Sequence, residues 1–325
     1  EAYPLHEYSM YGAVPIRHIK ETLLELRRAG TLNRVRMVLL TNCTFDGIVY
    51  NVERLMLECL AIKPDLVFLW DEAWFAFARF HPVYRQRTGM ATAAKLTQMF
   101  QSEDYAKRYA EFASSFGEEA WADDEKVLNT RLLPDPGKAR VRVYATQSTH
   151  KTLTSLRQGS MIHVWDQDFK DKTEEAFHEA YMTHTSTSPN YQILASLDVG
   201  RRQVEMEGYE LVQRQLELAM NLRDHVAAHP LLRRHFRFLT VTDLVPEEFR
   251  ESQVESLYNI DTGWANLLKA WRFDEFALDP SRATLAIGLT GMDGDTIKNK
   301  YLMDKYDIQI NKTSRNTVLF MTNIG

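Results

Sequence analysis

Two continuous apolar segments constrain the fold of this chain more than any other feature. Residues 36–41 and 66–70 read as strands without alternation of polar and apolar side chains, and residues 15–28 and 52–62 carry the apolar spacing of helices. Strands that are apolar on both faces need helices on both faces of their sheet. The alternation therefore predicts an α/β fold with a mainly parallel sheet, whose ligands bind at the carboxyl ends of the strands.

Two residues with catalytic potential follow predicted strands. The segment 66–70 ends in Asp71, and the β-branched segment 141–146 leads through small polar residues to Lys151. An amine at a strand end can bond covalently to an aldehyde, and a carboxylate can keep a pyridine nitrogen protonated. These two functional groups are the minimum that pyridoxal phosphate (PLP) chemistry requires of a protein. The alternatives are a helix cap for Asp71 and a surface position for Lys151.

Four short motifs occur in order along the chain. They are 41–47 (TNCTFDG), 71–74 (DEAW), 147–151 (QSTHK) and 184–189 (HTSTSP). Together they resemble the ornithine/lysine/arginine decarboxylases of bacteria, which are PLP enzymes of fold type I, and the resemblance extends over about 11–325. It implies an aspartate aminotransferase-like large domain and the decarboxylation of a basic amino acid with PLP as the cofactor.

The resemblance implies roles for the residues of the second and third motifs. Lys151 would hold the cofactor and later move a proton at the substrate Cα, and Asp71 would hold the ring nitrogen. Ala73 is small and would lie against the cofactor ring. Trp74 fits the site as well as it fits a protein core, and the role of Glu72 is ambiguous.

Polar residues beside the lysine suit a phosphate group. Ser148 offers a hydroxyl, and His150 offers an imidazole that can carry positive charge; the alternative for His150 is a catalytic position near Cα as a proton donor. In the family, the residue at the position of Ser186 reaches the phosphate of the neighbouring subunit. The resemblance therefore implies a homodimer or higher homo-oligomer with shared active sites. A helix N-cap is the competing role for Ser186.

The sequence predicts two domains. Residues 1–205 form a partial PLP-binding large domain with an inserted helical segment at about 89–138, which we expect to be a solvated excursion rather than a substrate lid. Residues 206–325 form a smaller α+β domain. The family's phosphate-cradling loop and its cofactor-stacking histidine lie upstream of the first residue, so the N-terminal part of the fold is expected to be missing.

A long helix is predicted to start at the end of the fourth motif. It runs from about 188 to 229, and Gly200 and Gly208 are expected to break it in two. The small domain is expected to contain three strands and one helix, at 236–241, 284–289, 317–322 and 295–306.

Composition and charge exclude several classes of protein. The 325 residues are 45% hydrophobic and 26% charged with a net charge of −5, which disfavours a nucleic-acid partner. No apolar run has the roughly 20 residues of a membrane span, and no signal peptide is apparent. Cys43 and Cys59 do not suggest a disulfide scaffold or a zinc site, and His225 and His229 lack the glutamate of a zinc-protease motif. A cytoplasmic enzyme without a metal is therefore expected.

Three functions fit these residues. The first is a PLP-dependent decarboxylase of free lysine, ornithine or arginine. The second is an aminotransferase or another fold-type I enzyme, which would use the same Lys151 and Asp71, with Arg315 as the nearest candidate for binding the substrate carboxylate. The third is a catalytically silent assembly subunit.

Overall fold

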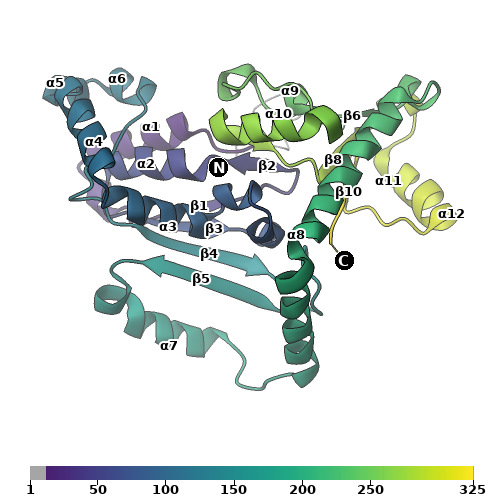
Figure 1. Cartoon of the computed structure of the whole chain (residues 1–325), viewed down its shortest axis with the longest axis horizontal. Helices are drawn as coiled ribbons and strands as arrows, with labels where there is room; N and C mark the ends of the chain where they lie inside the picture. Colours follow the sequence, from purple (N-terminus) through teal and green to yellow (C-terminus); the bar gives the residue numbers. More distant parts are fainter. Residues whose placement is uncertain (1–11, 259, 325) are drawn as a thin grey trace. The chain divides into compact units, whose positions relative to one another are not determined.

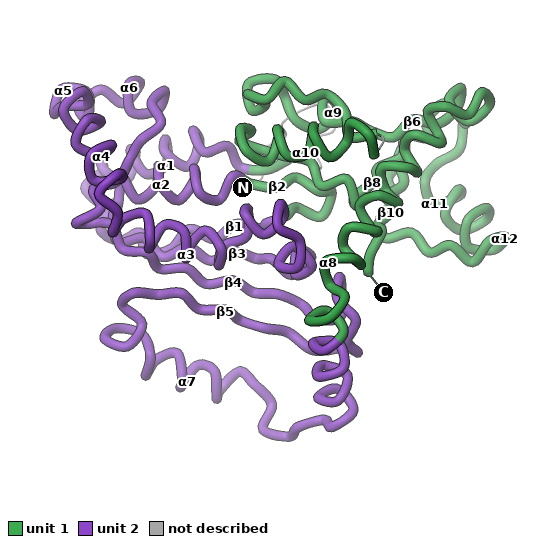
Figure 2. Tube along the Cα trace, viewed as in Figure 1, with its two compact units in different colours: residues 1–13, 43–50, 203–325 green, residues 14–42, 51–202 purple. Residues whose placement is uncertain are grey.

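The computed structural model describes residues 12–258 and 260–324. The chain divides into two compact units (Figure 2). Unit 1 combines residues 1–13, 43–50 and 203–325, and unit 2 combines residues 14–42 and 51–202. The first eleven residues, residue 259 and the last residue lie outside the described part. The predicted start of the first domain at residue 1, the predicted end of the second at residue 325 and the limits of the resemblance at 11 and 325 therefore also lie outside it.

Unit 2 is built around a four-stranded sheet with the order β1-β3-β4-β5 (Figure 1). Strands β1 (Met37–Thr41), β3 (Val67–Asp71) and β4 (Arg142–Ser148) are parallel, and β5 (Ser160–Asp166) is antiparallel to β4. The prediction of an α/β fold with a mainly parallel sheet is confirmed. Since β1, β3 and β4 point the same way, their carboxyl ends meet at one edge of the sheet.

The sheet differs from the expectation at both of its edges. The apolar run at 36–41 predicted a strand buried on both faces, but Met37 and Leu39 in β1 are 46% and 59% exposed. A continuous apolar run does not reveal whether helices cover one face or two. The other edge strand, β5, was not predicted. It mixes Ser160, His163 and Asp166 with apolar residues and has no clear period.

The first two helices follow directly from local sequence signals. Helix α1 (Ile16–Arg28) begins after Pro15 and ends at a glycine with positive φ, Gly30 at +67°. The amide of Thr31 donates to the Leu26 carbonyl at 2.9 Å, as in a Schellman motif. Helix α2 (Val52–Ile62) is capped by an asparagine side chain. Both helices agree with the predicted ranges within one residue.

The predicted insertion consists of four helices, and the first of them belongs to the core of unit 2. Helix α3 (Gly89–Phe100) lies along one face of the sheet and contacts β4 and β5 (Figure 1). A Cβ on Gly89 would meet Trp70 Cδ1 at 2.6 Å and Val143 Cγ1 at 3.4 Å, so this helix start approaches the sheet as closely as a glycine allows. The expectation of a solvated excursion is therefore wrong for α3.

The last helix of this segment is also tied to the core of unit 2. The Lys20 ammonium on α1 is 2% exposed and donates to Glu58 Oε2 at 2.6 Å. It also donates to the carbonyl oxygens of Val127 and Thr130, each at 2.9 Å. Three acceptors offset the cost of burying the ammonium. The helices that complete the segment are α4 (Glu103–Ser115), α5 (Glu118–Ala122) and α6 (Asp124–Asn129).

One long helix replaces the pair that was expected around residue 200. Helix α7 (Glu174–His184) is followed by α8 (Tyr191–Ala228), which continues without interruption through Gly200 and Gly208. A glycine inside a helix costs about 1 kcal/mol relative to alanine and does not by itself break the helix. Gly200 is buried, and a Cβ there would lie 3.3 Å from Thr154 Oγ1, so the glycine permits close packing on the loop after β4.

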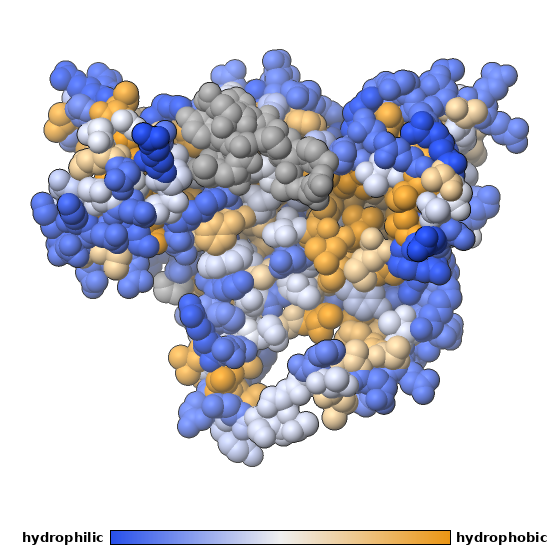
Figure 3. Space-filling view, turned by 180° about the vertical axis from the view of Figure 1, so that it is seen from behind, coloured by the Kyte–Doolittle hydropathy of each residue, from blue (hydrophilic) through white to orange (hydrophobic). Residues whose placement is uncertain are grey.

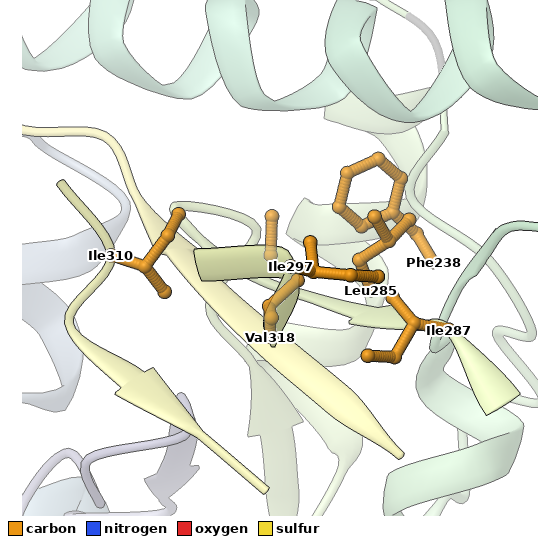
Figure 4. Close-up of a cluster of buried hydrophobic side chains, with 7 residues drawn as sticks. Phe238, Leu285, Ile287, Ile297, Ile310 and Val318 are labelled. Carbon is orange, nitrogen blue, oxygen red and sulfur yellow. The ribbon is translucent and has the colours of Figure 1, made fainter. Parts of the chain in front are cut away.

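Unit 1 has two small antiparallel sheets. The larger has the order β6-β8-β10-β9, and its buried core includes Phe238, Leu285 and Val318 (Figure 4). In the smaller sheet β2 (Ile48–Tyr50) pairs with β7 (Phe276–Leu278), which explains why residues 43–50 belong to this unit. The other strands are β6 (Arg237–Phe238), β8 (Arg282–Ala286), β9 (Lys312–Thr313) and β10 (Thr317–Met321).

The helices of unit 1 are short, apart from α10 and the part of α8 that belongs to this unit. The helix predicted at 295–306 is present, but its middle, Ile297–Met303, is a π-helix. The helices are α9 (Val241–Leu244), α10 (Ile260–Phe273), α11 (Gly294–Thr296) and α12 (Asp304–Tyr306).

Within residues 12–258 and 260–324, no helix has both the length and the apolar composition to cross a membrane. Hydrophilic side chains cover much of the face seen in Figure 3, and apolar side chains are exposed between them. In this view the apolar side chains gather in patches instead of standing singly.

Candidate active site

The two predicted catalytic residues lie at the carboxyl ends of neighbouring strands of unit 2. Asp71 is the last residue of β3 and is in register with Thr146 of β4. The next amide, that of Glu72, donates to the Thr146 carbonyl at 2.9 Å. Lys151 follows the end of β4 by three residues. The parallel pairing of β3 with β4 thus brings Asp71 to the strand end from which the lysine loop starts.

Asp71 has one occupied and one open carboxylate oxygen. Its Oδ1 accepts a hydrogen bond from the Ala73 amide at 3.1 Å, which closes a turn after the strand. The side chain is partly exposed, and among the described residues its Oδ2 has no hydrogen-bond partner. The predicted alternative, an α-helix cap, does not apply because the next α-helix begins at Gly89. Asp71 can therefore accept one further hydrogen bond.

Lys151 has an amine that no carboxylate pairs in the described part of the chain. Its Nζ lies 5.0 Å from the centre of the Trp74 ring, within the range of a cation–π contact. Trp74 is partly exposed, so it faces the lysine rather than filling the core. The lysine loop is held by its backbone, because Ser155 N donates to Thr149 O at 3.2 Å.

The polar residues beside the lysine include groups that have a fixed orientation and groups that have no hydrogen-bond partner. His150 Nδ1 lies 3.0 Å from the Gly159 carbonyl, which can only accept, so Nδ1 carries the proton and Nε2 stays available. Ser148 is 9% exposed, and the neighbouring Thr149 hydroxyl is buried without a hydrogen-bond partner among the described residues. The Thr152 hydroxyl, in a residue 5% exposed, is also without a partner there. Unpaired buried hydroxyls next to a lysine are what a site for an oxygen-rich ligand would show.

A second carboxylate stands directly beneath this site. Glu72 is fully buried and accepts three hydrogen bonds: from Gly89 N at 2.6 Å, from Gln147 Nε2 at 2.9 Å and from the Asn42 side chain. Burial raises the pKa of Glu72 to about 7, although its three donors act in the opposite direction. The donor Gly89 is the first residue of α3, where the helix dipole also favours a negative charge.

The network continues from this carboxylate to the edge strand. Gln147 uses its amide nitrogen for Glu72, so its Oε1 faces β5 and lies 3.2 Å from His163 Nε2. Burial lowers the pKa of His163. The ends of β1, β3 and β4, the start of α3 and strand β5 are joined through one chain of hydrogen bonds. The sequence analysis left Glu72 ambiguous and missed His163, although strand alternation places Glu72 opposite Asp71, on the covered face.

Ser186 is not brought to the lysine loop of its own chain. It belongs to the exposed connection between α7 and α8. Figure 1 shows this connection away from the carboxyl end of β4. Its hydroxyl accepts from Ser188 N at 3.1 Å in a local turn. The N-cap of α8 is Asn190, whose Oδ1 accepts from Ile193 N at 3.1 Å, so the competing capping role does not belong to Ser186.

Two other charged residues, Asp46 of the first motif and the predicted carboxylate binder Arg315, belong to unit 1. The Asp46 carboxylate is bound by Lys312 Nζ at 2.7 and 2.9 Å, an ion pair inside that unit. Arg315 lies on the exposed turn between β9 and β10. His225 and His229 are exposed near the end of α8, and the described residues contain no cluster of three or more His, Cys, Asp or Glu side chains suited to a metal ion.

The raised pKa of Glu72 predicts a pH-dependent stability. Below its ordinary pKa of 4.5 the group is neutral in both states. Between pH 4.5 and about 7 the unfolded chain ionises at Glu72 while the folded protein keeps the carboxyl protonated, so stability falls across this window and levels off above it. Wild type should lose up to about 3 kcal/mol between pH 5 and pH 8 from this group. Glu72→Gln cannot ionise at this position. The free energy of unfolding of wild type minus that of the variant, measured in urea, should therefore fall as the pH rises over that range.

Glu179→Gln, an exposed change on α7, is the matched control and should give a difference from wild type that is flat with pH. A Glu72→Gln difference that is equally flat would show that Glu72 keeps an ordinary pKa.

Comparison with known proteins places this chain in a family. The family model described as "Orn/Lys/Arg decarboxylase, major domain" matches residues 5–115 and 125–325. The lysine decarboxylase LdcA of Pseudomonas aeruginosa is 30% identical over 229 residues, covering 68% of this chain and 25% of that protein. The lysine decarboxylase of Hafnia alvei is 28% identical over 335 residues, covering 98% of this chain and 37% of that protein.

A solved structure shares the fold. The crystal structure of the Francisella novicida lysine decarboxylase LdcF aligns with a TM-score of 0.58 and 23% identity, over 97% of this chain and 37% of that one. The chain thus spans between 25% and 37% of the length of these proteins. The structural likeness confirms the predicted fold class, and the family model covers most of the sequence. The chain belongs to the Orn/Lys/Arg decarboxylase family.

Proposed function

We propose that this chain carries the lysine and aspartate of a PLP-dependent decarboxylase that acts on lysine, ornithine or arginine. The observation that carries the proposal is the placement of Asp71 and Lys151 at the ends of neighbouring parallel strands, each with an open polar group. The relatives named above are lysine decarboxylases, which supports a basic amino acid as the substrate. Because the chain spans between 25% and 37% of the length of these relatives, the activity is proposed for the whole protein.

The residues present fit PLP. An amine without a carboxylate partner, an open carboxylate oxygen and unpaired hydroxyls at Thr149 and Thr152 match its aldehyde, its ring nitrogen and its phosphate in kind. When bound, PLP supplies a cationic ring that accepts the electrons of a broken bond at Cα. Lys151 would hold the cofactor and Asp71 would keep its ring nitrogen protonated.

Neighbouring residues orient these groups. Ala73 would let a ring approach closely, and Trp74 confines the Lys151 amine through the cation–π contact. Ser148 and the Nε2 atom of His150 would bind phosphate oxygens. Decarboxylation replaces the lost carboxylate by a proton at Cα, and the amine of Lys151 or the imidazole of His150 would deliver it.

Two further parts of the proposal concern the setting of the enzyme. The exposed Ser186 would reach the cofactor phosphate of a neighbouring subunit, which makes a homodimer or larger homo-oligomer the functional unit. Cys43 and Cys59 are both free thiols, which is usual for proteins of a reducing compartment such as the cytoplasm.

Assays with variants at the two strand ends test the function. With PLP and L-lysine, L-ornithine or L-arginine, the protein should release CO2 and the corresponding amine. Lys151→Ala should abolish turnover, and Asp71→Asn should still bind PLP while losing about a hundredfold or more in rate, because an amide stabilises a ring cation poorly. Lys170→Ala, at an exposed lysine of the same unit, is the control. Full turnover by Lys151→Ala would refute the assignment.

Mixed subunits test the shared site. Ser186→Ala should weaken PLP binding by about tenfold, the loss expected for one hydrogen bond to a charged acceptor. In heterodimers of Lys151→Ala with Ser186→Ala, one site carries both defects and the other carries neither. Random pairing should then give about a quarter of the sites full PLP affinity and turnover. A mixture in which no site regains both properties would contradict sharing.

A further inference from the structure

The Glu72–Gln147 hydrogen bond joins the ends of β3 and β4, which carry Asp71 and the lysine loop of the proposed cofactor site. Glu72 directly follows Asp71, and Gln147 directly precedes Ser148 and the lysine loop. Successive residues of a strand point to opposite faces of the sheet. The pair therefore lies on the face covered by α3, while Asp71 and Ser148 point to the other face.

The donors and acceptors of this network allow one arrangement. Above about pH 7, where Glu72 is ionised, its carboxylate only accepts, so the amide nitrogen of Gln147 has to face Glu72. Its Oε1 then faces His163, whose Nε2 has to carry the proton in order to donate across 3.2 Å. Glu72 thereby sets the orientation of the Gln147 amide and the tautomer of His163.

Each member of the network is held by other elements. Glu72 is fixed by Gly89 at the start of α3 and by Asn42 after β1, and the Asn42 amide also donates to the Arg87 carbonyl at 2.8 Å. Glu72 and Asn42 are fully buried, and Gln147 is 7% exposed. Because the interior is densely packed, a change in this pair has to be taken up by the strand ends themselves.

We infer that Glu72 and Gln147 are positioning residues for the cofactor site, setting the separation of Asp71 from the Lys151 loop through their hydrogen bond. The inference rests on the proposed function for the identity of the ligand, but the hydrogen-bond arrangement stands apart from it. Neither residue touches the reacting atoms. They act through the strand ends that they join.

The test exchanges the two groups. In Glu72→Gln the new amide has to accept from Gly89 N through its oxygen, so its nitrogen faces Gln147, whose amide has to turn over. His163 then has to accept at Nε2 and becomes protonated at Nδ1. The double variant Glu72→Gln/Gln147→Glu restores an acceptor beside a donor, and His163 should return to the Nε2–H form. Nitrogen NMR of the His163 ring in the full chain at pH 8, without cofactor, reads the tautomer.

PLP affinity is the second measurement, taken from absorbance titration. Glu72→Gln should bind PLP about tenfold more weakly than wild type, as expected when a buried hydrogen-bonded pair is mismatched. The double variant should recover to within about threefold. Gln147→Met, which removes the amide at similar volume, should weaken binding as well and serves if Glu72→Gln fails to fold. Glu179→Gln should change neither reading.

The outcomes separate the two ideas. An unchanged His163 tautomer in Glu72→Gln would overturn the hydrogen-bond arrangement whether or not PLP binds. A switched tautomer with unchanged PLP affinity would overturn the positioning role alone. A wild type that binds no PLP would refute the proposed function and the positioning role with it, and the tautomer would still decide on the arrangement. Rescue of both readings by the double variant would support the inference.

Discussion

A single buried carboxylate joins the elements on which the candidate site depends. Glu72 binds the start of α3 through Gly89, the end of β4 through Gln147 and the end of β1 through Asn42. Burial of an isolated carboxylate would be prohibitive, and three donors offset part of that cost only when all three segments are in place. The interaction therefore favours one arrangement of the strand ends over alternatives in which any of them is displaced.

One face of the sheet in unit 2 is packed, and the other carries residues of the candidate site. The face beneath α3 carries the buried side chains of Trp70, Glu72 and Gln147. The Gln147 amide nitrogen donates a hydrogen bond to the Glu72 carboxylate. The opposite face carries Asp71, with an open carboxylate oxygen, and Ser148, which directly precedes the lysine loop. A packed underside holds groups on the other face in fixed positions, which is what binding and catalysis require of preorganised residues.

Local signals were enough to predict much of unit 2. The Pro15 start and the Gly30 end defined α1, and the apolar runs defined β1 and β3, since these features act within a few residues. Asp71 and Lys151 were found because strand-end polar residues are visible in a sequence. Strand β5 was not predicted because its mixed composition has no clear period. Helix α8 was predicted to break at its glycines, but a glycine lowers helix stability by only about 1 kcal/mol and the helix continues through both.

The supporting network could not be predicted in the same way. Glu72 is adjacent to Asp71 in sequence, but its partners Gly89 and Gln147 are 17 and 75 residues away. His163 depends on the antiparallel register of β5 on β4, which no local pattern fixes. Donor and acceptor matching is a property of the assembled fold. Alternation alone would have placed Glu72 on the covered face, where an acidic residue without donors would be too costly.

The central claim is that Lys151 is the residue that holds the cofactor, and covalent labelling tests it most directly. The protein is incubated with PLP, reduced with borohydride, digested and mapped by mass spectrometry. The account predicts one modified peptide, with the label on Lys151, and no label at that peptide in Lys151→Ala. Label on another lysine with Lys151 unmodified, or no stable label at all, would contradict it.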